Sequence, residues 1–580
     1  MDPLVRPGQS QQVVHLTNDP SETLVALLGD INPDSRSLYT WTQWPDRLWK
    51  RPYLTPKSES LLYDGFSRTH HICFRPLYLP QHWLTTSCSH GASSPSLSER
   101  SLDQSLLSIH FVVVGGGISG LCSAITLSRV GHEVTLIEAD ENMDETPLSA
   151  GAILPPNMVK LLKRWDLAEQ LQEMTAVMPG FEINRFDTGE YLGTHAWSEE
   201  LFREAGGELR TSNYSAFRKM LKDTALKNGV TIRMGTRVTS VSSKRHTQPI
   251  VTLDNGEVLR PDVVIGADGL KSVVRQYVRN DEEPEEKTYL GMDVYLMHIP
   301  GDRLAEDPEL KPYLEEQKLM RNTYGHKCGA YMYLTPPPPG SGRQYPDIVF
   351  HIFLAGEGDL TDWKQFTPDE LLQRMGEIWH IKAKMIKHAS MIVGGPIFER
   401  PVLEDWVSEE GRVIVIGDAA HLFYPGAIQN MGVAVCDAAT FGAFFRHLHH
   451  HRQIDAFLDA FAEIRPERIQ YMRTMDFANL DFMMMPNGEE QELRDSRLRQ
   501  RVKKGLNALD ADGVDDALNG ANVPSRWEAI VSIFCYDAEE EADKWWANWG
   551  SLQERASFSK IHTELRFDVQ SVEQTVVVEE

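Results

Sequence analysis

The chain has 580 residues, more than a single hydrophobic core usually organises, so two closely joined domains are expected. Hydrophobic residues make up 41% and charged residues 24%, values that exclude a collagenous, a fully disordered or a membrane-embedded chain. The net charge of −25 disfavours nucleic acid and anionic membranes as partners, which leaves a small molecule as the expected ligand.

The first residues, MDPLVRPGQSQQ, lack the basic stretch followed by an apolar one that marks a targeting signal. Six cysteines are scattered without a CxxC pair, which is typical of a reducing compartment. Together these observations predict a cytoplasmic protein. Residues 109–128 contain no Asp, Glu, Lys or Arg, but their glycines favour a strand-to-helix turn, so no transmembrane segment is predicted.

Residues 1–107 show no sustained periodicity, contain prolines and end in a serine-rich stretch, so a poorly structured N-terminal extension is expected. After it, residues 111–114 form an apolar run typical of a buried strand, and residues 134–137 predict a second strand. Between them, apolar side chains at helical spacing predict a helix that completes a βαβ unit: Ile118, Leu121, Cys122 and Ile125.

The next predicted elements are a hairpin that turns at Asn255 and Gly256 and a strand over residues 263–265 that ends in a polar turn. Between residues 288 and 395 the pattern changes to short strands joined by proline- and glycine-containing loops, which predicts a separate sheet. Its clearest strands are expected at residues 290–297, 329–335 and 348–354.

The first pattern then returns, with a strand over residues 412–416 and a helix from about Asn430. Two pieces of one nucleotide-binding fold therefore enclose the inserted sheet. The predicted fold class is α/β, a Rossmann-like fold with an inserted β-sheet substrate domain. The predicted division is an extension over 1–107, the nucleotide-binding domain over 108–287 and 396–480, the sheet domain over 288–395, and a helical segment with a tail over 481–580.

The strongest site signal is a GxGxxG motif directly after the first strand. Gly115 permits a tight turn, Gly117 lets a pyrophosphate approach the backbone, and Gly120 allows close packing of helix and strand. The helix that starts at Ile118 and Ser119 points its N–H groups at the phosphate. A glycine-rich loop without function is the alternative, and the strand, the helix and an acid in register disfavour it.

That acid is Glu138, at the end of the second predicted strand, where it can accept hydrogen bonds from an adenosine ribose. Its carboxylate would disfavour a 2′-phosphate there. Two later turns, GADGLKSVVR and GDAAH, place Asp268 and Asp418 at the carboxyl ends of predicted strands. Ligands of open α/β sheets bind at this edge, so the three turns are expected to share one ligand.

The motif order GxGxxG, GADGxxSxVR and GDAAHxxxP resembles that of the FAD-dependent aromatic hydroxylases, the single-component flavoprotein monooxygenases, and most closely fungal enzymes similar to salicylate hydroxylase. The resemblance covers about residues 109–550, with GAILPPNMVKLLKRW, FAEIRPERIQ and FCYDAEEEA as further matches. It implies an FAD-binding fold of the glutathione reductase type.

The resemblance implies that the GxGxxG residues and Glu138 hold the ADP half of FAD and that Asp418 hydrogen-bonds the ribityl chain. The Asp268 motif would serve both FAD and the transient NADH or NADPH. Pro425 would lie beside the reactive edge of the flavin, and the following helix start would point at the flavin N1–C2 carbonyl. Further FAD-binding residues implied are Ala152, Arg218, Ala419, Gly426, Asn430 and Met431.

Three positions depart from the family pattern. Asn430 stands where a glycine normally approaches the flavin, and Cys436 stands where a glutamate is common. Tyr214 takes the place of an arginine that contacts the flavin side, and Arg218 is a possible substitute. Asn tolerates a left-handed backbone better than most residues, so FAD binding is expected to survive.

The resemblance implies an FAD-dependent monooxygenase that uses NADH or NADPH and O₂ and hydroxylates a small aromatic or phenolic substrate through a flavin C4a-hydroperoxide. Two alternatives stay open: a flavin enzyme with another oxidative outcome, such as epoxidation or oxidative decarboxylation, and a catalytically impaired FAD-binding protein. A monomer or a homodimer is expected, and nucleic acid is not an expected partner.

No catalytic base can be assigned, and the flavin-side candidates are Pro425, His421 and Tyr214. His421 follows the Asp418 motif, where it is expected to pack or to hydrogen-bond locally. The histidine run at 447–451 lacks an HExxH or CxxC partner, so a solvated helix face is favoured over a metal site, and no metal is predicted.

Overall fold

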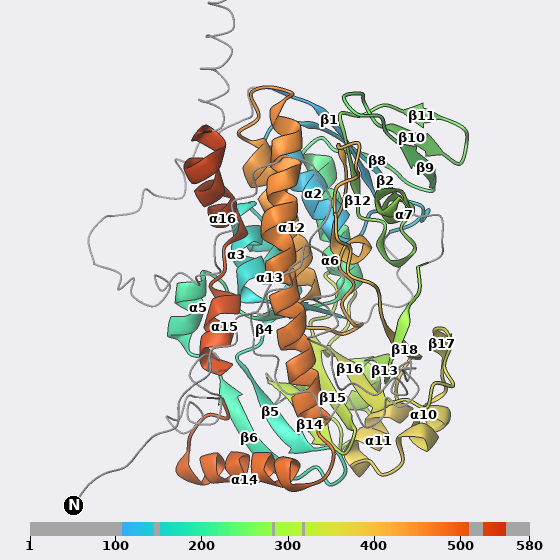
Figure 1. Cartoon of the computed structure of the whole chain (residues 1–580). Coiled ribbons are helices and arrows are strands. Elements are labelled where there is room, and N and C mark those ends of the chain that lie inside the picture. Colours follow the sequence, from blue (N-terminus) through green and yellow to red (C-terminus); the bar gives the residue numbers. More distant parts are fainter. Residues whose placement is uncertain (1–106, 144–150, 281–284, 316–318, 510–525, 553–580) are drawn as a thin grey trace, which may run out of the picture. The chain divides into compact units, whose positions relative to one another are not determined.

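The computed structural model describes residues 107–143, 151–280, 285–315, 319–509 and 526–552. Apart from Leu107, the predicted extension over 1–107 lies outside these residues. None of the helices in the described ranges combines the length and the apolar character needed to cross a bilayer. Two large sheets organise the described part of the chain (Figure 1).

The first sheet has five parallel strands, of which β1, β12 and β19 are short apolar runs buried on both faces, as is usual in parallel sheets. Helix α2 (Ile118–Arg129) packs on β1 and β2, and α7 (Val273–Arg279) packs on β12 and β19 (Figure 1). In spatial order the strands are β19 (Val413–Val415), β12 (Val263–Gly266), β1 (His110–Val114), β2 (Glu133–Ile137) and β8 (Thr231–Arg233).

This strand order determines where the predicted motifs meet. The strands β19, β12, β1 and β2 are consecutive neighbours and run in the same direction. The turns that follow them carry Asp418, Asp268, Gly115 and Glu138, and therefore emerge side by side at one edge of the sheet. The predicted α/β class with a Rossmann-like nucleotide-binding sheet is confirmed.

The second sheet has eight strands, and the three segments predicted as strands are its members β13, β16 and β15. It also contains β5 and β6, because β5 pairs in parallel with β14 and β6 pairs with β5. From the sequence, both strands were expected in the first part of the nucleotide-binding domain. In spatial order the strands are β17 (Lys364–Gln365), β18 (Met391–Glu399), β13 (Thr288–Ile299), β16 (Asp347–Ala355), β15 (Cys328–Thr335), β14 (Met320–Gly325), β5 (Gly180–Arg185) and β6 (Tyr191–Ala196).

Alternate side chains of the central strands face opposite sides of this sheet, as the pleat requires. On β15, Tyr331 and Tyr333 belong to the core shared with the first sheet, whereas Ala330 and Met332 face a second core. Four helices contribute to or flank that second core: α8 (Gly301–Ala305), α9 (Pro312–Glu315), α10 (Pro368–Met375) and α11 (His380–Lys387). Both faces are covered, which explains why the central strands β13, β15 and β16 are largely apolar.

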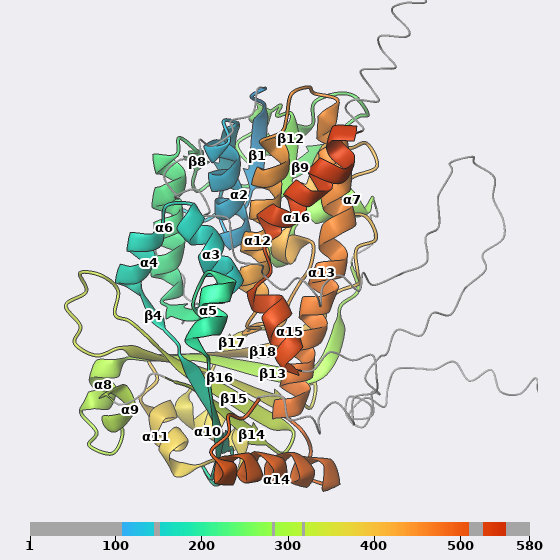
Figure 2. The ribbon, with the colours of Figure 1, turned by 90° about the vertical axis from the view of Figure 1, so that its left-hand side faces the viewer.

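The remaining elements connect or flank the two sheets. Helix α13 (Gln453–Met483) contacts α12 (Asn430–Phe445) and also β14 and β15, so it runs past both sheets (Figure 2). The predicted hairpin at Asn255 and Gly256 joins β10 to β11. The other elements are β3 (Ala152–Leu154), α3 (Pro156–Arg164), α4 (Ala168–Met174), β4 (Thr175–Val177), α5 (Glu199–Ala205), β7 (Arg210–Ser212), α6 (Tyr214–Lys227), β9 (Val238–Ser242), β10 (Ile250–Leu253), β11 (Val258–Leu259), η4 (Gly269–Lys271), η5 (Gly417–Ala419), α14 (Glu489–Lys504), α15 (Arg526–Phe534), α16 (Ala538–Trp545) and η6 (Trp546–Gly550).

One lysine is fully buried between α11 and the second sheet. The Lys382 ammonium donates a hydrogen bond to Thr323 Oγ1 at 2.7 Å and lies 5.5 Å from the ring centre of Phe350. Burial lowers the pKa of Lys382 to about 7. The folded state thus favours the neutral amine, whereas the unfolded chain keeps the proton up to its usual pKa near 10.5.

Replacing this lysine with methionine is expected to raise the melting temperature by a few degrees at pH 6 and by less at pH 9. Below the folded pKa of about 7 the wild type buries a full charge, and this cost disappears as the pH rises through the window between the two pKa values. Differential scanning calorimetry of Lys382→Met checks it. Lys384→Met is the control, because Lys384 is partly exposed and paired with Asp307 and Glu309. A gain that is the same at both pH values would contradict the prediction.

Candidate FAD site

The glycine-rich turn between β1 and α2 is tightly packed at two of its glycines. Gly115 has φ 102°, and a Cβ added there would overlap the carbonyl oxygen of Ala267. A Cβ on Gly120 would overlap the carbonyl oxygen of Gly115. These contacts give Gly115 and Gly120 the structural reasons that sequence analysis predicted for them.

Gly117 differs from the other two glycines. It is the N-cap of α2, with an ordinary φ of −74°, and a Cβ there would meet nothing within 4 Å. No described side chain caps this helix start. Gly117 therefore borders open space at the start of α2, as a phosphate-binding helix start requires, and the predicted residues Ile118 and Ser119 follow it as the first residues of the helix.

Glu138 closes one side of this space and is tied to the glycine turn. One carboxylate oxygen accepts the Gly116 N–H at 2.6 Å, and the other accepts the Asp140 N–H at 2.8 Å. Arg218 reaches over from α6, donating to the Gly116 carbonyl at 2.9 Å and to Glu138 at 3.2 Å. Arg218 is therefore a partner of the dinucleotide turn, an outcome that sequence analysis left open.

A cavity of about 280 Å³ lies at this point. Its walls combine a glycine backbone, a helix start, three acids, two arginines and a lysine, which suits a charged, elongated nucleotide. The hydrogen-bonding groups of this lining suit the ADP half of FAD. Of the residues predicted to bind FAD, its lining includes Gly115, Gly117, Glu138, Arg218 and Asp268.

Asp268 holds the second turn together. Its carboxylate accepts hydrogen bonds from Ser272 Oγ at 2.5 Å and from the Val273 N–H at 2.7 Å, which caps the start of α7. Burial raises the pKa of Asp268, and these hydrogen bonds oppose the rise. The carboxylate thus organises its own turn, and the turn lines the cavity.

Asp418 lies on the third turn, directly beside the first. Gly417 has φ 56°, and a Cβ there would overlap the Ser119 hydroxyl of α2. Arg275 of α7 donates to the carbonyls of Ala419 and Ala420 at 3.0 Å each, so the Asp268 motif holds the Asp418 turn in place. The three predicted turns therefore converge.

Two of the three departures from the family pattern, Asn430 and Tyr214, border the converging turns. Asn430 is the first residue of α12 and is not among the residues with positive φ, so the left-handed geometry considered from sequence is not needed. Its side chain hydrogen-bonds Asp418, whose pKa is raised by burial. Tyr214 starts α6 and lies within electrostatic reach of Arg218, Glu138 and Asp418.

His421 is fixed by packing, as expected from sequence. Its Nε2 lies 2.7 Å from an Asp437 oxygen, and its ring stacks on Trp406 with centres 5.4 Å apart. Arg465 binds the other Asp437 oxygen at 2.8 Å. The Arg465 and His421 charges outweigh the effect of burial and hold the pKa of Asp437 below its usual value. This geometry fits a structural role for His421.

Pro425 and Gly426 lie in the loop over 424–429, between the Asp418 turn and α12. Here the loop touches the second sheet. The Tyr331 hydroxyl donates to the Gly426 carbonyl, and His351 Nδ1 lies 2.7 Å from the same hydroxyl. Tyr331 and His351 are not predicted from the sequence, since their only signal is an alternating position on predicted strands.

The predicted residues Ala152 and Met431 border the same region. Ala152 begins β3 and is buried, and a Cβ on its neighbour Gly151 would lie 2.8 Å from the Tyr333 hydroxyl. Met431 lies in the first turn of α12. Among the described residues, no group of three His, Cys, Asp or Glu side chains could hold a metal ion.

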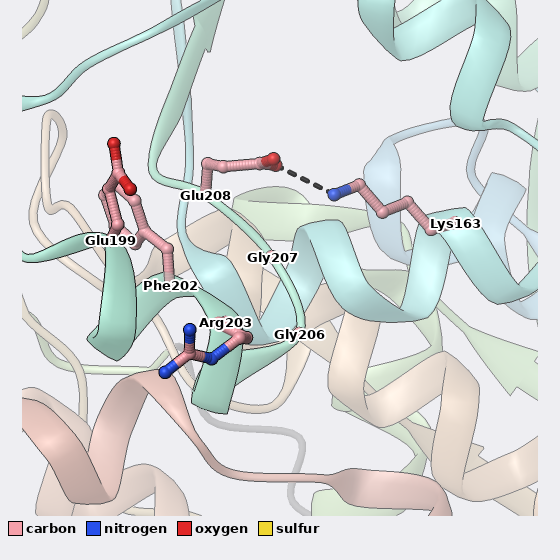
Figure 3. Close-up of a pocket in the computed structure, with 7 residues that line it drawn as sticks. All are labelled: Lys163, Glu199, Phe202, Arg203, Gly206, Gly207 and Glu208. Carbon is pink, nitrogen blue, oxygen red and sulfur yellow. Dashed lines mark hydrogen bonds and ion pairs between the residues drawn. The ribbon is translucent and has the colours of Figure 1, made fainter. Parts of the chain in front are cut away.

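A second cavity, of about 380 Å³, opens between α3, α5 and the turn after it (Figure 3). Lys163 and Glu208 form an ion pair of 2.8 Å at its rim. None of the residues predicted for the FAD site lines it. It plays no part in the site described above.

Known proteins match this chain along most of its described length. Residues 109–476 match the family described as FAD binding domain. The FAD-dependent monooxygenase OpS4 of Beauveria bassiana (strain ARSEF 2860) is 24% identical over 67% of this chain and 89% of its own. Hispidin-3-hydroxylase of Neonothopanus nambi is 26% identical over 68% of this chain and 93% of its own. A salicylate hydroxylase substrate complex superposes with a TM-score of 0.55 at 17% identity. The superposition covers 73% of this chain and 98% of that one.

The family match spans more than half of the chain and contains all three converging turns. The chain therefore belongs to the FAD binding domain family, and it is an FAD-dependent monooxygenase. The predicted cofactor FAD and the predicted enzyme class are confirmed.

Proposed function

We propose that this enzyme hydroxylates a small aromatic or phenolic substrate, using NADH or NADPH and O₂. One observation carries the proposal: the loop over 424–429, which follows the FAD-binding turn of Asp418, rests against an aromatic surface of the second sheet. Rings of Tyr331 and Phe353 lie 5.9 Å apart at this contact, and the Tyr333 ring stacks 6.3 Å from Tyr331.

This aromatic surface suits a flat ring. The side chains of Tyr331, Tyr333 and Phe353 are buried, so they would exclude water and stack against a planar substrate. Burial lowers the pKa of His351 to about 3, so its imidazole is neutral at physiological pH. A neutral, apolar surface of this kind favours phenols over substrates with several charges.

The residues around the turns would bind and orient FAD. The start of α2 would receive the pyrophosphate, Glu138 the adenosine ribose and Asp418 the ribityl chain. The start of α12 would direct its N–H groups at the pyrimidine edge of the flavin, where negative charge develops on reduction. Bound FAD would supply hydride acceptance from NADH or NADPH and activation of O₂.

The relatives support hydroxylation in particular. Hispidin-3-hydroxylase is, by its name, a hydroxylase of hispidin, and its match covers 68% of this chain. A second candidate function is a catalytically impaired FAD-binding protein. It is favoured by the hydrogen bond of Asn430 to Asp418, which occupies the proposed ribityl ligand.

Substrate-stimulated oxidation of NADH or NADPH by the FAD-loaded enzyme is the test. With a panel of simple phenols we expect faster loss of nicotinamide absorbance and a product heavier by one oxygen atom. Oxidation with a product of unchanged oxygen content would instead indicate another oxidative outcome. Inertness toward every donor, together with turnover restored by Asn430→Gly and Tyr214→Arg, would establish the impaired protein.

A further inference from the structure

A buried carboxylate holds the loop over 424–429 from the side of α13. Asp476 is 2% exposed, and its Oδ2 accepts the Gln429 N–H at 3.2 Å. Its backbone carbonyl accepts the Tyr424 hydroxyl at 3.1 Å. One residue of α13 therefore binds both ends of the loop.

No positively charged side chain among the described residues pairs with the Asp476 carboxylate. Within the described residues Asp476 forms no ion pair, and Arg473, one turn earlier on α13, binds Glu399 at 3.2 Å instead. The groups that face Asp476 from other elements are the Tyr424 phenol of the loop and the Tyr331 phenol of β15. Burial raises the pKa of Asp476 to about 7, and the bond from the Gln429 N–H opposes the rise.

Gln429 makes this contact important for the site. It is the N-cap of α12, and Asn430, the next residue, hydrogen-bonds Asp418. The Gln429 N–H is thus directed at Asp476, while the following N–H groups of α12 form the helix start described above. A hydrogen bond to an ionised acceptor is roughly twice as strong as one to a neutral acceptor, so the ionisation of Asp476 changes how firmly the loop is held.

We propose that Asp476 is a positioning residue, which sets the conformation of the loop over 424–429 and the charge behind the flavin's pyrimidine edge through the Gln429 amide. The proposal rests on the placement of the flavin beside this loop in the proposed function. Ionised, Asp476 holds the loop firmly and disfavours a reduced flavin anion. Protonated, it loosens the loop and removes that repulsion.

The visible absorption spectrum of the oxidised, FAD-loaded protein tests this without any substrate. Oxidised isoalloxazine does not titrate near neutrality, so a spectral shift there reports the protein. We expect the wild-type flavin bands to shift with a midpoint near the Asp476 pKa of about 7. The shift should vanish in Asp476→Asn, which keeps the side-chain size. It should persist in Asp459→Asn, an exposed position on the same helix, about 25 Å away along α13.

The flavin midpoint potential gives a second, independent readout. At pH 8 Asp476→Asn should raise it, because a negative charge is removed, and at pH 6 the two proteins should nearly agree. A pH-independent wild-type spectrum, or a shift retained in Asp476→Asn, would overturn the proposal. The wild-type titration needs no variant, so a misfolded variant does not decide the matter. A titrating spectrum in an enzyme inert toward every phenol would refute the proposed function alone.

Discussion

Gly117→Val is expected to weaken FAD binding by at least about tenfold, equal to about 1.4 kcal/mol, while leaving the melting temperature of the FAD-free protein unchanged. A side chain at Gly117 meets no protein atom within 4 Å and needs no unusual backbone angle. It would instead fill the space in front of the α2 helix start. Fluorescence titration of the FAD-free protein with FAD measures the affinity, and calorimetry measures the melting temperature.

Gly120→Val is the matched control, since it makes the same change three residues later. There the new side chain would overlap the Gly115 carbonyl, so both FAD binding and the melting temperature are expected to fall. If Gly117→Val bound FAD normally, the space before α2 would not be the pyrophosphate site. If it lowered the melting temperature as much as Gly120→Val, the distinction between the two glycines would be wrong.

Arg465→Met is expected to lower the free energy of unfolding by about 3–5 kcal/mol, because it removes the permanently charged partner of a buried carboxylate and leaves that carboxylate with His421 alone. Asp437 is fully buried, and Arg465 binds its Oδ1 at 2.8 Å. Arg499→Met is the control, since the exposed pair of Arg499 and Glu190 is worth less than about 1 kcal/mol. Urea unfolding at neutral pH compares the two variants with the wild type.

The destabilisation by Arg465→Met should also depend on pH. The pKa of Asp437 is lowered in the folded state, so its stabilising contribution is complete above its usual value of 3.8 and is lost as the pH falls through the folded value. The difference between wild type and variant should therefore shrink on acidification, first as the Asp437 carboxylate of the variant, which burial disfavours once Arg465 is gone, takes up a proton, and then as the wild-type carboxylate does. A difference that grew on acidification would contradict the ionised pair.

The dinucleotide turns could be predicted from sequence because their signals are local. Gly115, Gly120 and Glu138 act on neighbours that are close in sequence or one strand away, and a strand followed by a glycine turn and a helix is recognisable without a structure. Convergence of the Asp268 and Asp418 turns followed from the rule that ligands bind at the carboxyl edge of parallel strands. The structure supplies the strand order that brings them together.

The contacts of the loop could not be predicted in the same way. Tyr331 and His351 lie on strands that are apolar on both faces, so periodicity does not indicate which face meets the loop. Asp476 lies in a long helix with mixed polarity, and only the packing of α13 reveals that it is buried. The target of Arg218 depends on how α6 crosses the glycine turn, and the addition of β5 and β6 to the second sheet depends on pairing between distant segments.

The continuous course of α13 limits how the enzyme can admit its reactants. This single helix of 31 residues contacts α12 and also the strands β14 and β15. It therefore connects the nucleotide-binding region rigidly to the second sheet. A hinge motion that separates those two regions would have to bend α13. The helix is weakest at Pro466, which lacks an N–H to donate. Entry and exit are therefore expected to rely on small local rearrangements around the flavin rather than on wholesale separation of the two regions.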